Sequence, residues 1–292
     1  MSTAITRLIA DEGLPENYRE IVDRYWRPLS EDIAERVLEN EEGQPLIVGI
    51  NGAQGSGKTT LCQFLEVLLL EHNQRAATVS LDDLYLSRAE RMKLAKSCHP
   101  MFATRGVPGT HDVALGQSVL DALCDGLPVG LPHFDKASDD RSSEVTEILT
   151  RNDVILLEGW CIGAIPQPEA ALAEPINRLE AEEDPEGIWR REVNRRLATD
   201  YADFFGRIDT LVMLEVEGFE AVRAHRLKQE RKLAARRPDG SALMDEAALG
   251  RFLMHYERLT RWMLQEMPGR ADIAIKVGAD HRPLGCNRPQ GR

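Results

Sequence analysis

The sequence of 292 residues has few of the features that mark secreted, membrane-spanning or nucleic-acid-binding proteins. Its five cysteines are widely spaced and form no C-x-x-C pair, so we expect neither a disulfide framework nor a zinc site. No run approaches the roughly 18 apolar residues of a membrane span, and the start lacks the charged-then-apolar layout of a secretion signal. Lysine and arginine number 36 against 48 acidic residues, and this net charge of −12 disfavours general nucleic-acid binding. We therefore expect a cytoplasmic protein without a nucleic-acid or membrane partner.

What the chain does contain is an alternation of short apolar runs with helical patterns. Apolar runs typical of strands lie at 46–50, 76–81, 154–157, 211–214 and 273–277. Helical periodicity is found at 61–70, 113–124, 188–205, 218–236 and 245–266. Strands that alternate with helices predict an α/β fold, with a doubly wound parallel sheet of about five strands and helices on both faces.

The two ends of the chain differ from this alternating region. Residues 15–41 have helical period, which we expect Pro28 to interrupt, with Ser30 as the N-cap of a second piece. The expected division is an N-terminal helical extension over 1–44, one domain over 45–281 and a disordered tail over 282–292.

A glycine-rich motif follows the first expected strand. Gly52-Ala-Gln-Gly-Ser-Gly57-Lys58-Thr59 fits the P-loop pattern G-x-x-x-x-G-K-[ST]. Glycines let backbone N–H groups surround phosphate oxygens, and the following helix directs its positive end at the same anion. Lys58 would reach the outer phosphates and the Thr59 hydroxyl would hold Mg²⁺. The predicted nucleotide-binding residues are Gly52, Ala53, Gln54, Gly55, Ser56, Gly57, Lys58, Thr59 and Thr60.

Acidic residues follow two other expected strands. No Asn-Lys pair exists, so the chain lacks the N-K-x-D sequence that reads guanine in GTPases. Glu158 ends the third expected strand, where an acid can orient a metal-bound water or simply cap the strand. Asp82 and Asp83 end the second strand, and ligands bind outside the carboxyl ends of parallel strands. We expect Asp82 to be the general base for an attacking alcohol and Asp83 to be a turn residue.

Several blocks together resemble the D-glycerate 3-kinase family and its bacterial kinase-like members. They are 52–60, S-L-D-D-L-Y at 80–85, R-G-V-P-G-T-H-D at 105–112, L-P-H-F-D-K at 131–136 and L-E-G-W at 157–160. The resemblance covers about residues 45–280, and extends more distantly to pantothenate kinase, uridine kinase and phosphoribulokinase. It implies a P-loop NTPase-type kinase with a helical lid that uses ATP and Mg²⁺ to phosphorylate a small hydroxy-acid. It also implies that Asp82 is the base and that Glu158 lies at the metal.

The resemblance directs attention to basic residues for the acceptor and the lid. A carboxylate-bearing acceptor needs cationic groups, and Arg105, His111, Lys136 and Arg141 are the candidates. Related kinases use a lid arginine to stabilise the transferred group, and Arg226 is the candidate here. Members often carry Trp-Arg where this chain has His225-Arg226, and many have a glycine-rich run after Lys136 that it lacks. Alternative functions are a pantothenate or nucleoside type of kinase, or a nucleotide-binding regulatory module.

Overall fold

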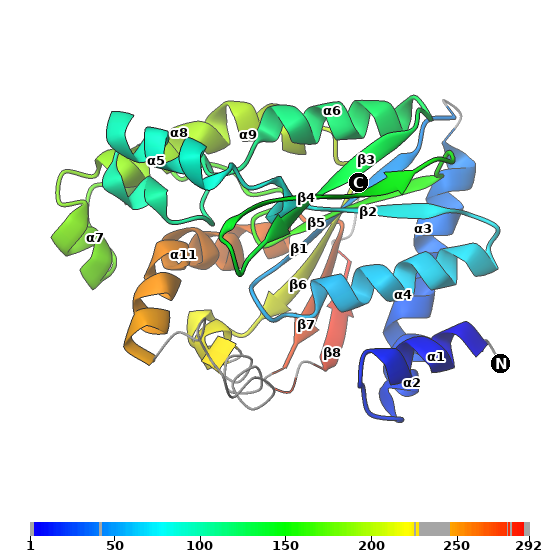
Figure 1. Ribbon diagram of the computed structural model, residues 1–292. Helices are drawn as coiled ribbons and strands as arrows, with labels where there is room; N and C mark the ends of the chain where they lie inside the picture. The colour runs from blue at the N-terminus through cyan, green and yellow to red at the C-terminus, as the bar shows by residue number, and fades with distance from the viewer. Residues whose placement is uncertain are drawn as a thin grey trace.

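The central sheet runs through the middle of the molecule. The computed structural model describes residues 3–40, 43–224, 226–227, 246–278, 280 and 282–288. Within these residues, six strands form one sheet in the order β2-β5-β1-β6-β7-β8 (Figure 1). Their bounds are β1 (Leu46–Gly52), β2 (Ala76–Ser80), β5 (Val154–Gly159), β6 (Thr210–Val216), β7 (Ile273–Val277) and β8 (Pro283–Asn287). The first five are parallel and match the five expected runs.

Helices cover both faces of this sheet, as the alternating pattern predicts. On one face α3 (Arg27–Glu39) and α4 (Lys58–Glu71) pack with α1 (Thr3–Asp11) and α2 (Tyr18–Ile21). On the other face lie α6 (Val113–Cys124), α8 (Ile188–Ala198), α9 (Asp200–Phe205) and part of α11 (Glu246–Glu266). Successive residues of β1 serve the two cores, because strand side chains alternate between faces: Ile47 packs on one side and Val48 on the other. All of β1 is therefore buried.

The C-terminal tail departs from the expectation of disorder. Residues 283–287 form β8, which pairs antiparallel with β7 and makes a sixth strand instead of about five. This edge strand is short and largely exposed. Its sequence therefore lacks the continuous apolar run from which a strand could be predicted. Residues 289–292 lie outside the described part of the chain.

Pro28 does not interrupt the N-terminal helical stretch. α2 continues through a π-helical turn, η1 (Val22–Trp26), directly into α3. Pro28 falls in the first turn of α3, where a missing N–H is tolerated. Ser30 is not an N-cap, because it is buried within the helix and its hydroxyl donates a hydrogen bond to the Arg27 carbonyl oxygen at 2.8 Å.

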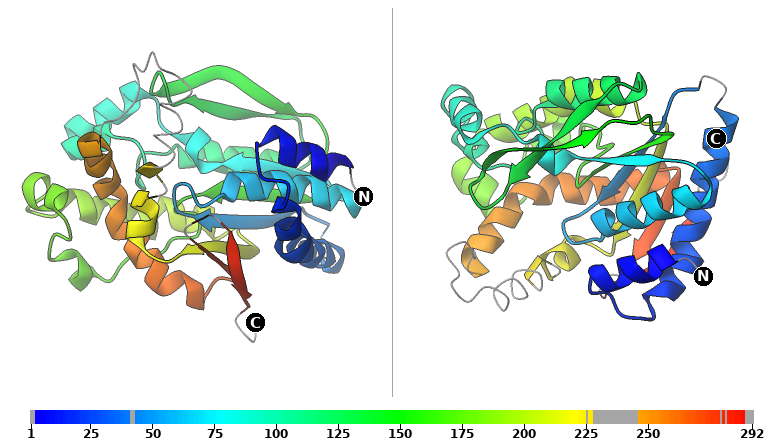
Figure 2. Two further views of the ribbon diagram at one scale, coloured as in Figure 1. Left: turned by 90° about the horizontal axis from the view of Figure 1, so that it is seen from below. Right: turned by 45° about the vertical axis from the view of Figure 1, so that its right-hand side comes forward.

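A separate antiparallel hairpin, which the sequence pattern did not indicate, lies beside the sheet. β3 (Val129–Asp135) pairs with β4 (Asp140–Ile148), and Figure 2 shows the pair as a ribbon along one side of the molecule. The hairpin packs against η2 (Leu81–Leu84), the single turn that follows β2. Its own turn thereby reaches the edge where the parallel strands end.

The remaining helices are α5 (Arg88–Ser97) and α7 (Arg178–Glu183), with the short turns η3 (Pro100–Ala103), η4 (Glu169–Leu172) and η5 (Met267–Gly269). The expected helix at 188–205 is divided at Thr199 into α8 and α9. Of the expected helix at 218–236, residues 219–224 and 226–227 are helical, and 225 and 228–236 lie outside the described residues.

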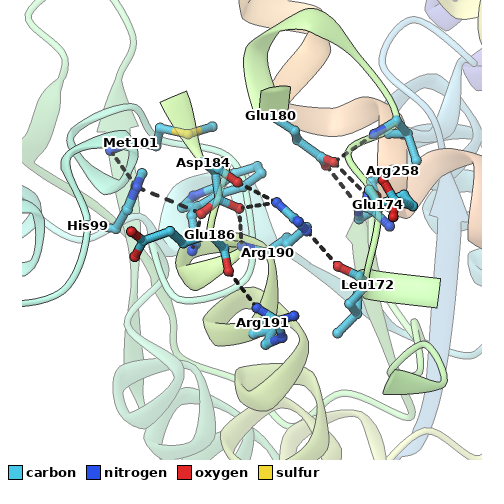
Figure 3. Close-up of polar contacts among 12 residues, drawn as sticks. His99, Met101, Leu172, Glu174, Glu180, Asp184, Glu186, Arg190, Arg191 and Arg258 are labelled. Atoms are coloured by element: carbon cyan, nitrogen blue, oxygen red, sulfur yellow. Dashed lines mark hydrogen bonds and ion pairs between the residues drawn. The ribbon is translucent and has the colours of Figure 1, made fainter. Parts of the chain in front are cut away.

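Two buried ion pairs fix α7 and α8 in place (Figure 3). Arg258 of α11 contacts Glu180 of α7 at 2.6 Å, and also donates to the backbone carbonyls of Ala171 and Glu174. Arg190 of α8 contacts Asp184 at 3.0 Å with both side chains 1% exposed. Buried charges persist only when they are paired and hydrogen-bonded, so these contacts specify how the region packs on α11.

Candidate active site

The glycine-rich loop lies between β1 and α4, as predicted. Gly55 and Gly57 have positive φ angles of 77° and 93°, which side chains other than glycine adopt at a cost. A Cβ atom at Gly52 would lie 2.4 Å from the Ser56 hydroxyl oxygen, so the loop could not close over a larger residue. α4 begins at Lys58 immediately after the loop, and its helix dipole adds positive potential there.

A carboxylate and two hydroxyls meet next to the loop. Glu158 at the end of β5 is 4% exposed, and its Oε1 accepts hydrogen bonds from Thr59 (3.3 Å) and Ser80 (2.9 Å). Its Oε2 lies 3.9 Å from the Lys58 ammonium and has no hydrogen-bond partner among the described residues. Among the described residues, no group of three or more His, Cys, Asp or Glu side chains is arranged so that it could hold a metal ion. One hydroxyl and one carboxylate with a spare oxygen suit Mg²⁺, which takes its other ligands from phosphates and water.

Asp82 lies in the turn η2 that follows β2. Its Oδ1 accepts a hydrogen bond from the Tyr85 hydroxyl at 3.0 Å, and its Oδ2 lies 2.7 Å from the Lys136 ammonium. Burial acts to raise the pKa of Asp82, but the positive charges of Lys136 and Lys58 outweigh it and hold that pKa well below its ordinary value. Asp82 is therefore an ionised carboxylate.

The neighbouring Asp83 contacts the β3–β4 hairpin and has a structural role. Its Oδ1 accepts the backbone N–H of Phe134 at 2.9 Å, which ties the β3–β4 hairpin to η2. His133 lies 3.7 Å from its other oxygen. Burial raises the pKa of Asp83. This anchoring contact fits the expected turn role; Asp83 also lines the cleft, but of the two acids Asp82 is the one whose pKa the Lys58 charge lowers.

One cleft of 1140 Å³ joins these groups. It is lined by residues 54–60 of the loop, by Asp82 and Glu158, and by the cations Lys136 and Arg226. Gly52 and Ala53 lie outside its lining, at the end of β1. The structure thus brings the phosphate-binding loop, the carboxylates Asp82 and Glu158, and the cations Lys58, Lys136 and Arg226 to one cleft.

Three predicted acceptor residues do not line this cleft. Arg105 pairs with Asp139 in the hairpin turn, and its guanidinium lies 5.5 Å from the centre of the Phe134 ring. Arg141 binds Asp112 at 2.7 Å and donates to the Tyr85 carbonyl oxygen at 3.0 Å. Their direct contact with an acceptor stays a prediction; in the structure they support the turn and the loop around Asp82.

His111, the third of these residues, is buried behind Tyr85. Its ring stacks on the Tyr85 ring at 4.5 Å, and its Nδ1 lies 2.6 Å from the Tyr201 hydroxyl. That hydroxyl accepts the Gly109 N–H, so it can donate its own hydrogen to His111 Nδ1. Burial lowers the pKa of His111 to about 3, so the ring is neutral. A neutral ring that accepts at Nδ1 carries its hydrogen on Nε2.

Two residues without a predicted role also shape the site. The Tyr256 hydroxyl of α11 donates to the Arg105 carbonyl oxygen at 3.1 Å, and a Cβ at Gly106 would collide with it. Asp139 holds both Arg105 and the fully buried Arg91. Neither contact has a local signal in the sequence, because the partners are brought together only by the tertiary fold.

Comparisons with known proteins place this geometry in a family. An uncharacterized kinase, mug58, of Schizosaccharomyces pombe is 37% identical over 228 residues, covering 74% of this chain and 79% of that protein. The chloroplastic D-glycerate 3-kinase of Arabidopsis thaliana is 28% identical over 269 residues, covering 85% of this chain. The chain belongs to the glycerate kinase-like family of P-loop kinases.

Solved structures agree with the glycerate kinase-like assignment. A D-glycerate 3-kinase from Cryptococcus neoformans matches with a TM-score of 0.74 and 26% identity, over 90% of this chain and 97% of that one. The KAP family P-loop domain model matches residues 26–97, which include the phosphate-binding loop. The chain spans 56% of the length of the Arabidopsis enzyme.

No helix in the described residues is long and apolar enough to cross a membrane.

Proposed function

We propose that the protein transfers the γ-phosphoryl group of ATP to the hydroxyl of a small hydroxy-acid, with D-glycerate and 3-phosphoglycerate as substrate and product. The observation that carries this proposal is the position of Asp82. It is an ionised carboxylate in the same cleft as the phosphate-binding loop, and it pairs with the Lys136 ammonium from the hairpin turn. A nucleotide switch without an acceptor has no use for a base at that position.

The cleft residues supply each part of an in-line transfer. Asp82 accepts the hydroxyl proton as the new oxygen–phosphorus bond forms and the bond to the β,γ-bridging oxygen breaks, which leaves ADP. Lys58 and the loop amides hold the phosphates, and Arg226 offers a further positive charge from the cleft wall. Thr59 and Glu158 would hold Mg²⁺, which neutralises charge on the phosphate oxygens when bound.

The proposal that the acceptor is a hydroxy-acid rests on the positive charge of Lys136 and on the names of two similar proteins. Lys136 is 59% exposed and reaches Asp82 from the hairpin, so it can also contact an anionic acceptor that enters beside that carboxylate. Two similar proteins, from Arabidopsis and Cryptococcus, are named D-glycerate 3-kinases. A cytoplasmic location stays a prediction.

An acceptor panel tests the proposal. Purified protein with ATP and Mg²⁺ is given D-glycerate, L-glycerate, pantothenate, uridine or no acceptor, and ADP and the phosphorylated product are measured. We expect turnover with D-glycerate, with 3-phosphoglycerate as the product. Turnover with pantothenate or uridine alone would contradict the acceptor but retain the kinase. ATP hydrolysis at one rate under all conditions would contradict acceptor phosphorylation altogether.

A further inference from the structure

Tyr85 lies directly behind the proposed base. Its side chain is buried, and its hydroxyl donates a hydrogen bond to Asp82 Oδ1 at 3.0 Å. Asp82 belongs to the 3₁₀ turn η2, and Tyr85 follows that turn immediately. Side chains three residues apart lie on the same side of a 3₁₀ turn, so this spacing brings the hydroxyl to the carboxylate. Tyr85 is not among the residues that line the cleft, so it contacts the base and not a substrate.

Aromatic rings hold the Tyr85 side chain from two elements. The His111 ring stacks on it with centroids 4.5 Å apart, and the Phe134 ring of the hairpin meets it edge-on at 5.2 Å. The Tyr85 backbone is also held, because it forms an isolated antiparallel bridge with His111. Its carbonyl oxygen accepts a hydrogen bond from Arg141 at 3.0 Å. A side chain packed in this way has little freedom to rotate, so its hydroxyl is a fixed donor.

The two oxygens of Asp82 therefore have partners of different kinds. Burial raises the pKa of Tyr85 well above its ordinary value, so the hydroxyl keeps its hydrogen and donates it to Oδ1. Oδ2 instead pairs with the Lys136 ammonium, whose side chain is 59% exposed. A lysine ammonium on its flexible stem can turn to another anion, whereas the packed tyrosine cannot. Oδ2 is thus the oxygen whose partner can move away when an acceptor enters.

We propose that Tyr85 is a positioning residue for phosphoryl transfer, and that its hydrogen bond to Oδ1 of Asp82 presents Oδ2 to the acceptor hydroxyl. As the hydroxyl oxygen bonds to the γ-phosphorus, its proton passes to Oδ2 and the bond to the β,γ-bridging oxygen breaks. The hydrogen of Tyr85 stays on its own oxygen throughout. The role of Tyr85 rests on the proposed function of Asp82 as the base, but not on the identity of the acceptor.

Other ionisable groups surround this pair and bear on any pH profile. Burial raises the pKa of Cys161 and of Tyr256 and lowers that of His111, so these three groups are uncharged near neutral pH. All of them remain when only the Tyr85 hydroxyl is removed, so a change in the profile reports Asp82. The groups that face Asp82 or Tyr85 are Lys58 of α4, Lys136 of the hairpin, Asp83 of η2, His111, Cys161 after β5 and Tyr256 of α11.

Tyr85→Phe removes the hydroxyl and keeps the packed ring. Loss of this hydrogen bond raises the pKa of Asp82 and makes it a stronger base, so a lower rate must come from lost orientation. With ATP, Mg²⁺ and D-glycerate, or the panel acceptor that is turned over, kcat should fall by about 10–100-fold. The KM for that acceptor and the affinity for the β,γ-imido analogue of ATP should stay unchanged. Tyr201→Phe is the matched control, because it removes another buried hydroxyl that contacts the His111 ring, and it should keep kcat close to the wild-type value.

A double-mutant cycle separates positioning from a general structural role. In the Asp82→Asn background there is no base to orient, so the addition of Tyr85→Phe should lower kcat no further. A further loss as large as that in the wild-type background would overturn the inference, because Tyr85 would then act through the fold and not through Asp82. A near-normal kcat for Tyr85→Phe beside a large loss for Asp82→Asn would also overturn it, and would leave the proposed function standing.

The acid limb of kcat gives a second readout in the Lys136→Met background. Loss of that ammonium brings the pKa of Asp82 up toward its ordinary value, where a limb is measurable. The addition of Tyr85→Phe should move the limb to still higher pH, by about one unit. The addition of Tyr201→Phe should leave it in place. Identical limbs with and without the Tyr85 hydroxyl would contradict its action on the base.

Discussion

At the scale of single residues, two effects act on the pKa of Asp82 in opposite directions. Its burial favours the neutral acid, whereas Lys136 at 2.7 Å and Lys58 favour the carboxylate. The effect of the two lysines is larger, so the pKa of Asp82 is lowered. A base with a lowered pKa is a weak proton acceptor in the ground state. In phosphoryl transfer the attacking hydroxyl becomes acidic only as its bond to phosphorus forms, so orientation by Asp82 matters as much as basicity.

Replacing Lys136 should move the acid limb of the activity profile. In Lys136→Met the nearest positive charge is lost, so the pKa of Asp82 rises toward its ordinary value. The acid limb of kcat against pH should then lie at higher pH than in the wild type. Lys93→Met, at an exposed position of α5, is the control. Superimposable profiles for the Lys136 variant and the wild type would refute the electrostatic role of this pair.

His111 should give stability a pH dependence of known sign. Its folded pKa of about 3 lies below the ordinary value of 6.5, so the unfolded chain takes up a proton first. The wild type therefore loses stability as pH falls from about 6.5 toward 3. His111→Asn keeps a polar partner for Tyr201 and cannot titrate. Denaturant unfolding should show the stability difference between the two proteins shrinking as the pH falls; a constant difference would contradict the buried neutral ring.

At the scale of elements, a buried ion pair joins α7 to α11. Glu180→Ala would leave Arg258 charged and unpaired in the interior, which costs about 3–5 kcal/mol of unfolding free energy. Glu182→Ala removes a matched partner on the same helix, because Glu182 pairs with Arg178 at the surface. That change should cost about 1 kcal/mol or less. Similar losses in the two variants, measured by denaturant unfolding, would show that the buried pair is not what fixes α7.

Strands of the central parallel sheet could be predicted from sequence, and the largely exposed strands could not. The runs at 46–50, 154–157 and 273–277 each lie within a strand, because a covered strand has a continuous apolar sequence. β4 is largely exposed and polar, so nothing in its sequence resembles a core strand. Pro28 does not interrupt the helix as expected, because a π-helical turn precedes it and the proline falls in the first turn of α3.

The residues of the candidate site also fall into two groups: those that the sequence predicts and those that only the fold reveals. Lys58 and Thr59 follow from the loop motif, and Asp82 and Glu158 follow from the rule that parallel strands end at one edge. The Asp139–Arg105 pair and the Tyr256 contact join elements far apart in the chain, so only the fold reveals them. The lining of the cleft also includes residues near both ends of the chain, such as Leu14 and Pro283, which no single motif unites. Arg226 lines the cleft, whereas the rest of the predicted basic helix, from 228 on, lies outside the described residues.

At the scale of the whole molecule, the cleft shares the negative balance of the protein, because its lining has six carboxylates against four lysine and arginine side chains. The chain carries a net charge of −12, which repels anionic substrates at long range. Attraction of the phosphates and of an acidic acceptor must therefore act at short range, through individual side chains such as Lys58, Lys136 and Arg226. Lys58 comes from the start of α4 and Lys136 from the hairpin turn, and the packing of the hairpin on η2 brings both side chains to one cleft.

The kinetic effect of Asp82→Asn tests the central claim most directly. The amide keeps the shape of Asp82 but cannot accept the hydroxyl proton, so kcat with ATP and D-glycerate should fall by about 10²–10⁴-fold. Affinity for the ATP analogue should change little, because the loop still holds the phosphates. A variant that keeps kcat close to the wild-type value would contradict the assignment of Asp82 as the base beside the phosphate-binding loop.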